Sequence, residues 1–333
     1  MRHPFRLLKS TLILLTCNLC AGTPEELPSA SPRPESEHNL YAMFDVLYWH
    51  ATENTNWSQT LTGGVPPSEV DFHAVSFGWD PGIRAGLGYK FNYDNWDTQF
   101  CYTWFHTSAT DSVSTNSGEV LSIFIGAGLS IAAIYKSASI KWNIDFNMFD
   151  WDLGCNVRVS EGLSLRPFIG VKGGWINQSL RTHWENPDFP GLDTVLIADE
   201  NLKNNFWGVG PRVGANGKWN FVYAGKNSFG LFGDFQGAFL WGHWSFKDSF
   251  HNNLPEDIPS FIESKDLGTL MFGALMGLSW DVAFNRDRFH FTTRLGYEIQ
   301  DWINQYQIFE VANGANKKSL YLQGAVLDLR FDF

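Results

Sequence analysis

The chain is poor in charged residues, in cysteine and in long apolar runs. Only 18% of its 333 residues are Asp, Glu, Lys or Arg, whereas a soluble protein of this size usually carries about 25%. Two of the four cysteines lie in the first 22 residues, and the two that remain are too few for a disulfide scaffold. No apolar run reaches the ~20 residues that a membrane-spanning helix needs. These shortages count against an ordinary soluble enzyme, a cross-linked secreted domain and a helical membrane protein.

The motifs of catalysis and of metal binding are also missing. Beyond the first 22 residues, no pair of Cys or His residues has the C-x-x-C or H-x-x-x-H spacing of metal ligands, so we expect no metal and no cofactor. The stretch GVGPRVG, residues 208–214, lacks the spacing and the strand-to-helix context of a phosphate loop. Six histidines near expected strand ends stand outside any recognisable catalytic signature, so we expect no catalytic residues and no enzyme. These histidines are His50, His73, His106, His183, His243 and His251.

The balance of charge is acidic. The formal net charge is −11 at neutral pH. Removal of the first 22 residues, which hold three cations and no carboxylate, would lower it further. This sign argues against binding nucleic acid or anionic lipid as a main task.

The N-terminus has the pattern of a signal peptide over residues 1–22. Three cations in the first nine residues precede a short apolar core, and the small residues Ala21 and Gly22 offer a cleavage site. The alternative is a lipoprotein signal that ends at Cys17 or Cys20, although neither cysteine has small residues in front of it. In both cases the sequence predicts export.

Two further parts follow the signal. Residues 23–40 are rich in Pro, Ser and Glu and have no apolar period, which predicts a disordered periplasmic leader. Residues 41–333 form the expected folded domain, because apolar and polar residues alternate there with period two.

The alternation is clearest in segments 83–91, 140–148 and 289–299. A strand places alternate side chains on opposite faces, so each segment is expected to turn one face to hydrocarbon and the other to water. In the second segment the apolar face comprises Ile140, Trp142, Ile144, Phe146 and Met148, and the polar face comprises Lys141, Asn143, Asp145 and Asn147. Segments of ~10–16 residues with aromatics near their ends favour a membrane barrel over a soluble β-sandwich.

The segments together predict an all-β fold, a transmembrane antiparallel β-barrel of about ten strands, with twelve as the alternative. Long connections alternate with short ones, which places both termini in the periplasm and the long loops outside the cell. The expected strands are 41–51, 82–92, 97–107, 138–149, 163–177, 205–219, 228–243, 268–284, 287–301 and 319–333.

Two segments fit this pattern less well. Val120–Tyr135 is mostly apolar and lies inside an expected loop, where a loop hairpin, an inward-folded plug or an extension of the fourth strand are all open. In Phe149–Asn156 the apolar phase shifts to Phe149, Trp151 and Leu153, which we interpret as a bulge or as the periplasmic aromatic girdle.

The face that is expected to line the lumen is highly charged. Its cations are concentrated on the fifth and sixth strands and most of its carboxylates lie on the last four, which would set a field across a water-filled pore. The alternative is that the charges pair inside a filled barrel, since ten strands lie between about eight, which side chains fill, and about sixteen, which leave a channel. The expected pore-lining residues are Arg84, Lys90, Lys141, Asp145, Arg166, Lys172, Arg212, Lys218, Asp234, Asp281, Arg294, Glu298, Asp328 and Arg330.

Cys101 and Cys155 lie on neighbouring expected strands, both toward the periplasmic side. Alignment of those strand ends would bring the two thiols together. A cross-strand disulfide is therefore one hypothesis in an oxidising compartment, and two separate thiols are the other.

Four motifs resemble those of the Legionella-type major outer membrane protein family, which includes the similar proteins of Chlamydia relatives. They are FDVLYWHA (44–51), WDPGIRAGLGY (79–89), SLRPFIGVKGGWI (164–176) and FWGVGPRVG (206–214). The resemblance implies an outer-membrane barrel with porin-like activity or a structural, surface-exposed role, and it brings no catalytic residues. Chlamydial major porins proper are cysteine-rich and cross-linked, and this chain departs from them in that respect.

The expected function is a porin-like channel for small hydrophilic solutes or ions. The alternative is a filled barrel with a structural, surface-display or adhesion role. Expected partners are outer-membrane lipid and lipopolysaccharide, with a homo-oligomer left open and no nucleic acid. Phe333 ends the chain after alternating apolar residues, which is typical of the signal that the barrel-assembly machinery reads, although an ordinary edge strand gives the same ending.

Overall fold

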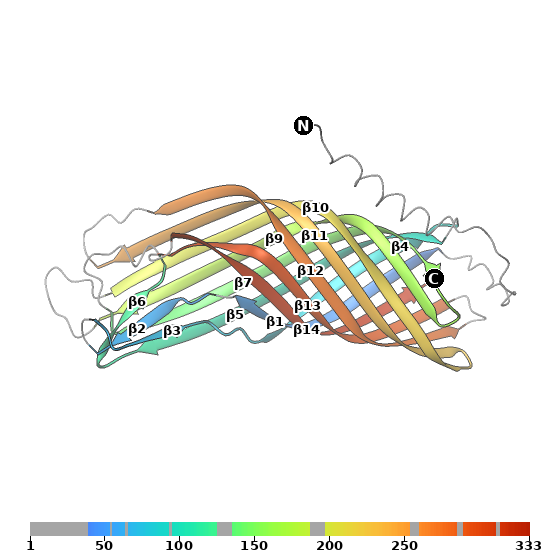
Figure 1. Cartoon of the computed structure of the whole chain (residues 1–333), viewed down its shortest axis with the longest axis horizontal. Helices are drawn as coiled ribbons and strands as arrows, with labels where there is room; N and C mark the ends of the chain where they lie inside the picture. Colours follow the sequence, from blue (N-terminus) through green and yellow to red (C-terminus); the bar gives the residue numbers. More distant parts are fainter. Residues whose placement is uncertain are drawn as a thin grey trace, which may run out of the picture.

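The computed structural model describes residues 39–333 apart from 54, 64–65, 93–94, 125–134, 187–196, 254–259, 285–288 and 311–313. The expected signal peptide and nearly all of the expected leader lie outside the described residues. No helix in the described part of the chain could span a membrane. Ten long strands dominate it (Figure 1): β1 (Leu40–Glu53), β4 (Trp79–Lys90), β5 (Trp96–Ser114), β7 (Ser137–Cys155), β9 (Leu163–Glu185), β10 (Ile197–Ala224), β11 (Asn227–Asn252), β12 (Phe261–Phe284), β13 (Phe289–Glu310) and β14 (Gly314–Asp332).

The ten strands close into one antiparallel barrel. Each pairs with the long strand that follows it in the chain, and β1 pairs with β14 to close the ring. The described ends of the chain meet at one end of the barrel, where the amide of Phe333 donates to the carbonyl oxygen of Leu40 at 3.1 Å. We call this end, which also carries the shorter connections, the turn end, and the opposite end the loop end. The predicted fold class is confirmed.

The strands extend well beyond the expected boundaries at the loop end. β10 and β11 are 28 and 26 residues long, against about ten that a membrane crossing needs. The barrel is therefore much taller than a bilayer is thick, and part of its wall has to stand in water. This part is the left half of Figure 1.

The outer wall changes from apolar to polar at one level along each strand. On β9 the outward residues Ile169, Val171 and Trp175 are 57%, 39% and 38% exposed, and the next outward residues toward the loop end are Asn177 and Ser179. Inward residues change in the opposite sense, from charged at the turn end to apolar at the loop end. This reversal marks where the wall leaves hydrocarbon and enters water.

Aromatic side chains mark the same level on neighbouring strands. Trp175 of β9 lies opposite Trp207 of β10, and the ring of Tyr48 stacks on that of Trp79 with centroids 5.8 Å apart. We call the following exposed residues the aromatic belt: Tyr48, Trp79, Trp104, Trp175, Trp207, Trp241 and Tyr321. Such girdles are typical of membrane interfaces.

A second group of aromatics lies at the turn end. Phe331 stacks on Phe289 and on Phe333, with ring centroids 5.8 Å apart in both pairs. On β10, Trp219 lies twelve positions from Trp207, which is about 40 Å along the strand and about 30 Å along the membrane normal at a tilt of ~40°. The two girdles are thus separated by about one hydrocarbon thickness.

The expected orientation of segment 140–148 is wrong. Ile140, Trp142, Ile144, Phe146 and Met148 are at most 2% exposed and point into the barrel, because this stretch of β7 belongs to the part of the wall that stands in water. The bulge that was one of the two interpretations of Phe149–Asn156 is also absent, since β7 pairs with β5 and β9 without a register shift. The change of phase in the sequence is the crossing of the membrane boundary.

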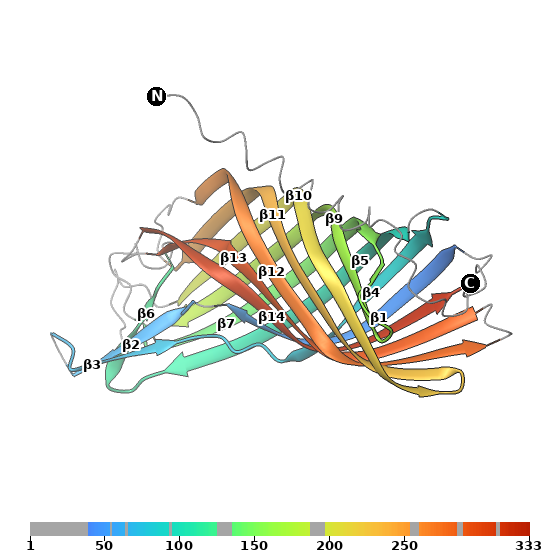
Figure 2. The same ribbon diagram turned by 45° about the vertical axis from the view of Figure 1, so that its right-hand side comes forward.

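Three short strands form a separate sheet at the loop end (Figure 2). β2 (Ser58–Thr62) pairs with both β3 (Glu69–His73) and β6 (Gly118–Ser122). The open segment Val120–Tyr135 supplies the last three residues of β6, and its described residues Val120, Phe124 and Tyr135 are at most 1% exposed. Residues 125–134 of this segment lie outside the described part.

Candidate functional site

The turn-end half of the barrel encloses a cavity of about 1960 Å³. Its lining includes Phe91, Asn92 and Asn95 and residues 156–158, 160–163 and 225–228, all at the turn end, so the cavity opens toward that end. Twelve of the residues expected to line a lumen do line it: Arg84, Lys90, Arg166, Lys172, Arg212, Lys218, Asp234, Asp281, Arg294, Glu298, Asp328 and Arg330. We call this cavity the charged chamber.

Lys141 and Asp145 are corrections to the expected lumen set. Both lie on the water-exposed stretch of β7, whose polar face points outward. Asp145 contacts His106 of β5 on the outer surface, with Oδ1 and Nδ1 2.6 Å apart. Neither residue lines the chamber.

A network of ion pairs is centred on Arg166 of β9. The Arg166 guanidinium donates Nε to Asp97 at 2.7 Å and Nη2 to Asp152 at 2.6 Å. The Arg212 guanidinium donates Nη1 to the second oxygen of Asp152 at 3.0 Å. Asp97, Asp152 and the Arg166 side chain are at most 9% exposed. Charges buried to this degree are stabilised only when paired, so the network acts as one unit.

Neighbouring pairs extend this network around the wall. Lys172 donates to Asp150 at 3.0 Å. On the opposite side, Arg84 bridges Asp45 and Glu298 at 3.0 Å each, which links three strands. The chamber wall is thereby braced across strands.

A further set of pairs lies nearer the turn end. Arg294 donates to Asp234 at 3.0 Å and also contacts Asp328. Arg330 and Lys90 share Asp332, at 2.9 and 2.6 Å. Lys218 pairs with Asp281. The chamber is therefore polar, yet its charges are largely compensated locally.

Four acidic residues of the chamber wall were missed at the sequence level: Asp45, Asp97, Asp150 and Asp152. Asp97, Asp150 and Asp152 come from β5 and β7 and neutralise the cations of β9 and β10. The alternation of Asp150 and Asp152 with Phe149 and Trp151 is the signal that could have found them. The interpretation of this stretch as a bulge hid it.

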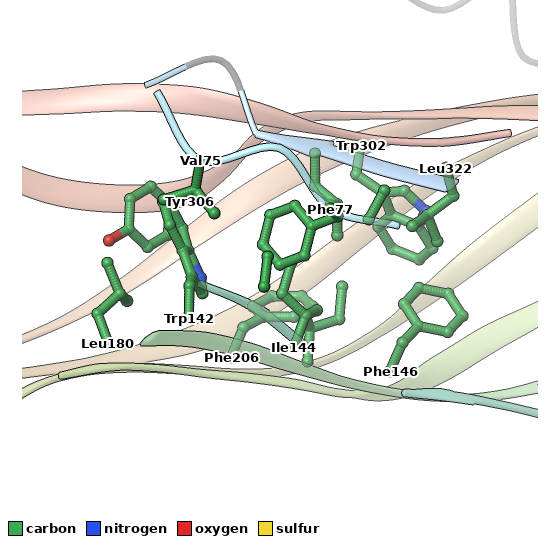
Figure 3. Packing of buried hydrophobic residues seen from close by; sticks show 14 of the residues in the cluster. Val75, Phe77, Trp142, Ile144, Phe146, Leu180, Phe206, Trp302, Tyr306 and Leu322 are labelled. Carbon is green, nitrogen blue, oxygen red and sulfur yellow. The ribbon is translucent and has the colours of Figure 1, made fainter. Parts of the chain in front are cut away.

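An apolar core closes the chamber on its loop side (Figure 3). Trp49, Trp142, Trp302 and Tyr306 are at most 1% exposed. The ring of Trp142 on β7 contacts that of Tyr306 on β13, with centroids 5.3 Å apart. β7 and β13 are five positions apart in the ring of ten strands, so these side chains meet from opposite walls.

Residues between β1 and β4 add to this core. Phe77 is 3% exposed and its ring lies 5.8 Å from that of Trp142. Val75 and Phe77 both point toward the cluster in Figure 3, and Trp57 is fully buried. The segment from residue 55 to residue 78 thus supplies three large apolar groups to the closure.

A polar cluster around Gln178 is embedded in the apolar core. Gln178 donates its amide to Glu53 at 2.6 Å and to Gln305 at 3.1 Å, and its own oxygen accepts from Trp142 at 2.9 Å. Glu53 lies five positions beyond Tyr48 of the aromatic belt, and its side chain points into the part of the barrel that stands above the membrane. Burial raises the pKa of Glu53 from 4.5 to about 8.

The disulfide hypothesis is wrong. Cys101 lies opposite Asp150, whereas Cys155 lies opposite Trp96. The two cysteines are therefore five positions apart along paired strands, about 17 Å, and no disulfide joins them. Disulfide geometry requires Cα atoms within about 7 Å.

No three His, Cys, Asp or Glu side chains in the described ranges lie close enough together to hold a metal ion. The histidines on the outer wall contact carboxylates instead. His243 and Asp266 are 2.8 Å apart, as are His183 and Asp199.

The family model described as Legionella pneumophila major outer membrane protein precursor matches residues 32–333. The chain belongs to this family. The membership confirms the predicted resemblance and the outer-membrane location of the barrel. No curated protein matches the chain.

Solved outer-membrane barrels are similar to this member of the family at low identity. Outer membrane protease OmpT from Escherichia coli is 10% identical, with a TM-score of 0.41 over 91% of this chain and 99% of that one. A Pseudomonas aeruginosa FadL homologue is 11% identical, with a TM-score of 0.32 over 89% and 90%. Ail of Yersinia pestis is 11% identical, with a TM-score of 0.25 over 88% and 99%.

Proposed function

We propose that this family member is an envelope barrel that is closed to solutes in the conformation described, and that it serves to anchor its surface loops and to brace the outer membrane. The observation that carries the proposal is the contact of Trp142 with Tyr306 across the barrel, from opposite walls. Below it, Phe146 meets Trp302 from the same two walls, with centroids 5.5 Å apart. These contacts leave the interior filled where a porin would have its constriction.

The energetics of ion passage support a closed state. An ion that crossed the core would lose its hydration among aromatic and aliphatic side chains, at a cost of several kcal/mol even after relaxation. The charged chamber does not remove this barrier, because it ends at the level of Thr103, Phe146 and Gln300. A bracing role requires charged groups that are held rigidly in pairs, and the charges of the chamber are paired in this way.

Planar-bilayer conductance tests the proposal. The refolded wild-type protein is expected to give no stepwise currents at concentrations that insert many barrels. A Trp142→Ala/Trp302→Ala variant, which hollows the core, is the matched control and is expected to give discrete steps. Steps of constant size from the wild type would refute the closed barrel and would favour the porin-like channel of the original expectation.

A gated channel is a second candidate, and a specific observation favours it. Residues 74–78 belong to no strand, yet Phe77 fills the space beside Trp142. Movement of the segment 55–78 out of the barrel would remove Trp57, Val75 and Phe77 from the core. A cleavable bifunctional thiol reagent that joins Phe77→Cys to Trp142→Cys would then abolish, reversibly on cleavage, any current that the unlinked double variant shows.

A further inference from the structure

Four cations lie together on the outer wall above the aromatic belt. Lys141 of β7, Arg181 of β9, Lys203 of β10 and Lys247 of β11 are all exposed. These four strands are side by side in the barrel. None of the four forms an ion pair with the described residues. We call them the cationic tetrad.

The strand register makes the tetrad contiguous. Lys141 lies directly opposite Arg181, and Lys203 lies directly opposite Lys247. Arg181 is opposite Asn201, two positions from Lys203 on the same strand, so the two pairs are diagonal neighbours. Like charges placed directly opposite destabilise a sheet. Two such pairs side by side therefore point to an anionic ligand that offsets the repulsion.

The surroundings of the tetrad are rich in hydrogen-bonding groups. Carboxylates on this face contact histidines: Asp145 contacts His106 at 2.6 Å, and Asp199 and Glu185 both contact His183, at 2.8 and 2.9 Å. The outward neighbours of the tetrad include Ser108, Thr110, Asn143, Ser179, Asn201, Ser245 and Ser249, and the exposed Ile262 lies opposite Lys247. Hydroxyl and amide groups around a cationic centre suit a phosphorylated sugar.

The height of the tetrad matches the head-group layer. Lys203 lies four positions beyond Trp207, and Lys247 six positions beyond Trp241, both toward the loop end. At ~3.3 Å per residue and a strand tilt of ~40°, the tetrad stands about 10–15 Å above the belt. The wall directly below is apolar, with Val209, Val213 and Phe239 exposed. The same strands thus offer one surface for acyl chains and one for anionic sugars.

We propose that the cationic tetrad binds the phosphate groups of a phosphorylated glycolipid, the lipopolysaccharide of the surrounding outer leaflet. Lys203, four positions beyond the belt, contacts the phosphates nearest the acyl chains, while Lys141, Arg181 and Lys247 contact those farther out. The guanidinium of Arg181 can bind a phosphate through two parallel hydrogen bonds. The chain as a whole is acidic, so the attraction for phosphate groups is confined to the surface around these four cations.

Binding to the detergent-solubilised full-length barrel tests the proposal. The probes are purified lipopolysaccharide, the same material after enzymatic dephosphorylation, phosphatidylglycerol and inorganic phosphate. The test variant is Lys203→Gln/Lys247→Gln. The matched control is Arg158→Gln/Lys226→Gln, which removes two exposed cations at the turn end. Heat-modifiable migration on gels verifies that each variant is folded.

The expected result is a loss of about tenfold or more in affinity for phosphorylated lipopolysaccharide in the test variant, with the control unchanged. Without the glycolipid, the test variant should be at least as heat-resistant as wild type, because a like-charge pair is gone. Equal affinity of the test and control variants would overturn the proposal. So would equal binding of the dephosphorylated material, of phosphatidylglycerol, or of inorganic phosphate alone.

Discussion

Trp175 on β9 lies directly opposite Trp207 on β10, and two positions farther toward the loop end Asn177 lies opposite Asn205. An aromatic pair followed at once by an amide pair defines a sharp boundary on the outer wall. Inside the barrel at the same level, the content changes from charged to apolar. Hydrocarbon therefore surrounds the charged half of the barrel, and water surrounds the apolar half.

The position of this boundary predicts how an outward charge is tolerated. Val213→Arg, six positions below Trp207 and 54% exposed, should lower the free energy of unfolding in bilayers by about 2–4 kcal/mol. Asn205→Arg, just above the belt on the same strand, should change it by less than about 0.5 kcal/mol. Urea titrations in lipid vesicles would measure both, and similar losses for the two variants would contradict the boundary.

Much of the barrel could be predicted from alternation alone, since all ten strands were expected and their turn-end halves had the correct face outward. Segment 83–91 shows why: Ile83 and Leu87 are outward and Arg84 is inward. The alternation within 140–148 is equally regular, yet its apolar face points inward. Period two fixes which residues share a face but not whether lipid or water lies outside, and that depends on the height of the segment.

The charged chamber could be predicted in part. Inward charges on the turn-end halves were identified one strand at a time, but their partners were not. Arg166 is held by Asp97 and Asp152 from strands that precede it by 69 and 14 residues. Only the register of three adjacent strands brings these groups together. The closure by Phe77 was beyond prediction for the same reason, because it comes from a connection and not from a strand.

The Arg166 network predicts a large effect of neutralising its centre. Arg166→Gln leaves Asp97 and Asp152 buried with one cation fewer, which should cost about 3–5 kcal/mol of unfolding free energy. Arg181→Gln, an exposed arginine on the same strand, should cost almost nothing. Urea unfolding of the two variants side by side would measure the difference, and a loss below about 1 kcal/mol for Arg166→Gln would show that the pairs are not coupled.

The ring of Phe206 lies close to two glycines, Gly208 and Gly242. A Cβ at Gly242 would stand 2.2 Å from Cε2 of Phe206 and 2.7 Å from the backbone oxygen of Trp207, whereas one at Gly237 would meet Phe272 at an ordinary 3.5 Å. Gly242→Ala should therefore cost about 1–3 kcal/mol through overpacking, and Gly237→Ala should be tolerated. The temperature at which half of each variant loses its folded migration on gels measures the difference in stability. Equal temperatures for the two variants would contradict the packing described.

Glu53 predicts a fall in stability with rising pH. Its pKa rises from 4.5 to about 8 because the carboxyl is buried beside Gln178, so the folded state holds the proton more tightly than the unfolded chain does. The contribution of the neutral carboxyl is complete below pH 4.5 and is lost as the pH rises through about 8. Glu53→Gln keeps an acceptor for Gln178 and should flatten the decline of the unfolding midpoint between pH 5 and pH 9. Glu119→Gln, at an exposed position of β6, should leave that decline unchanged, and an unaltered decline in Glu53→Gln as well would assign the pH dependence to other groups.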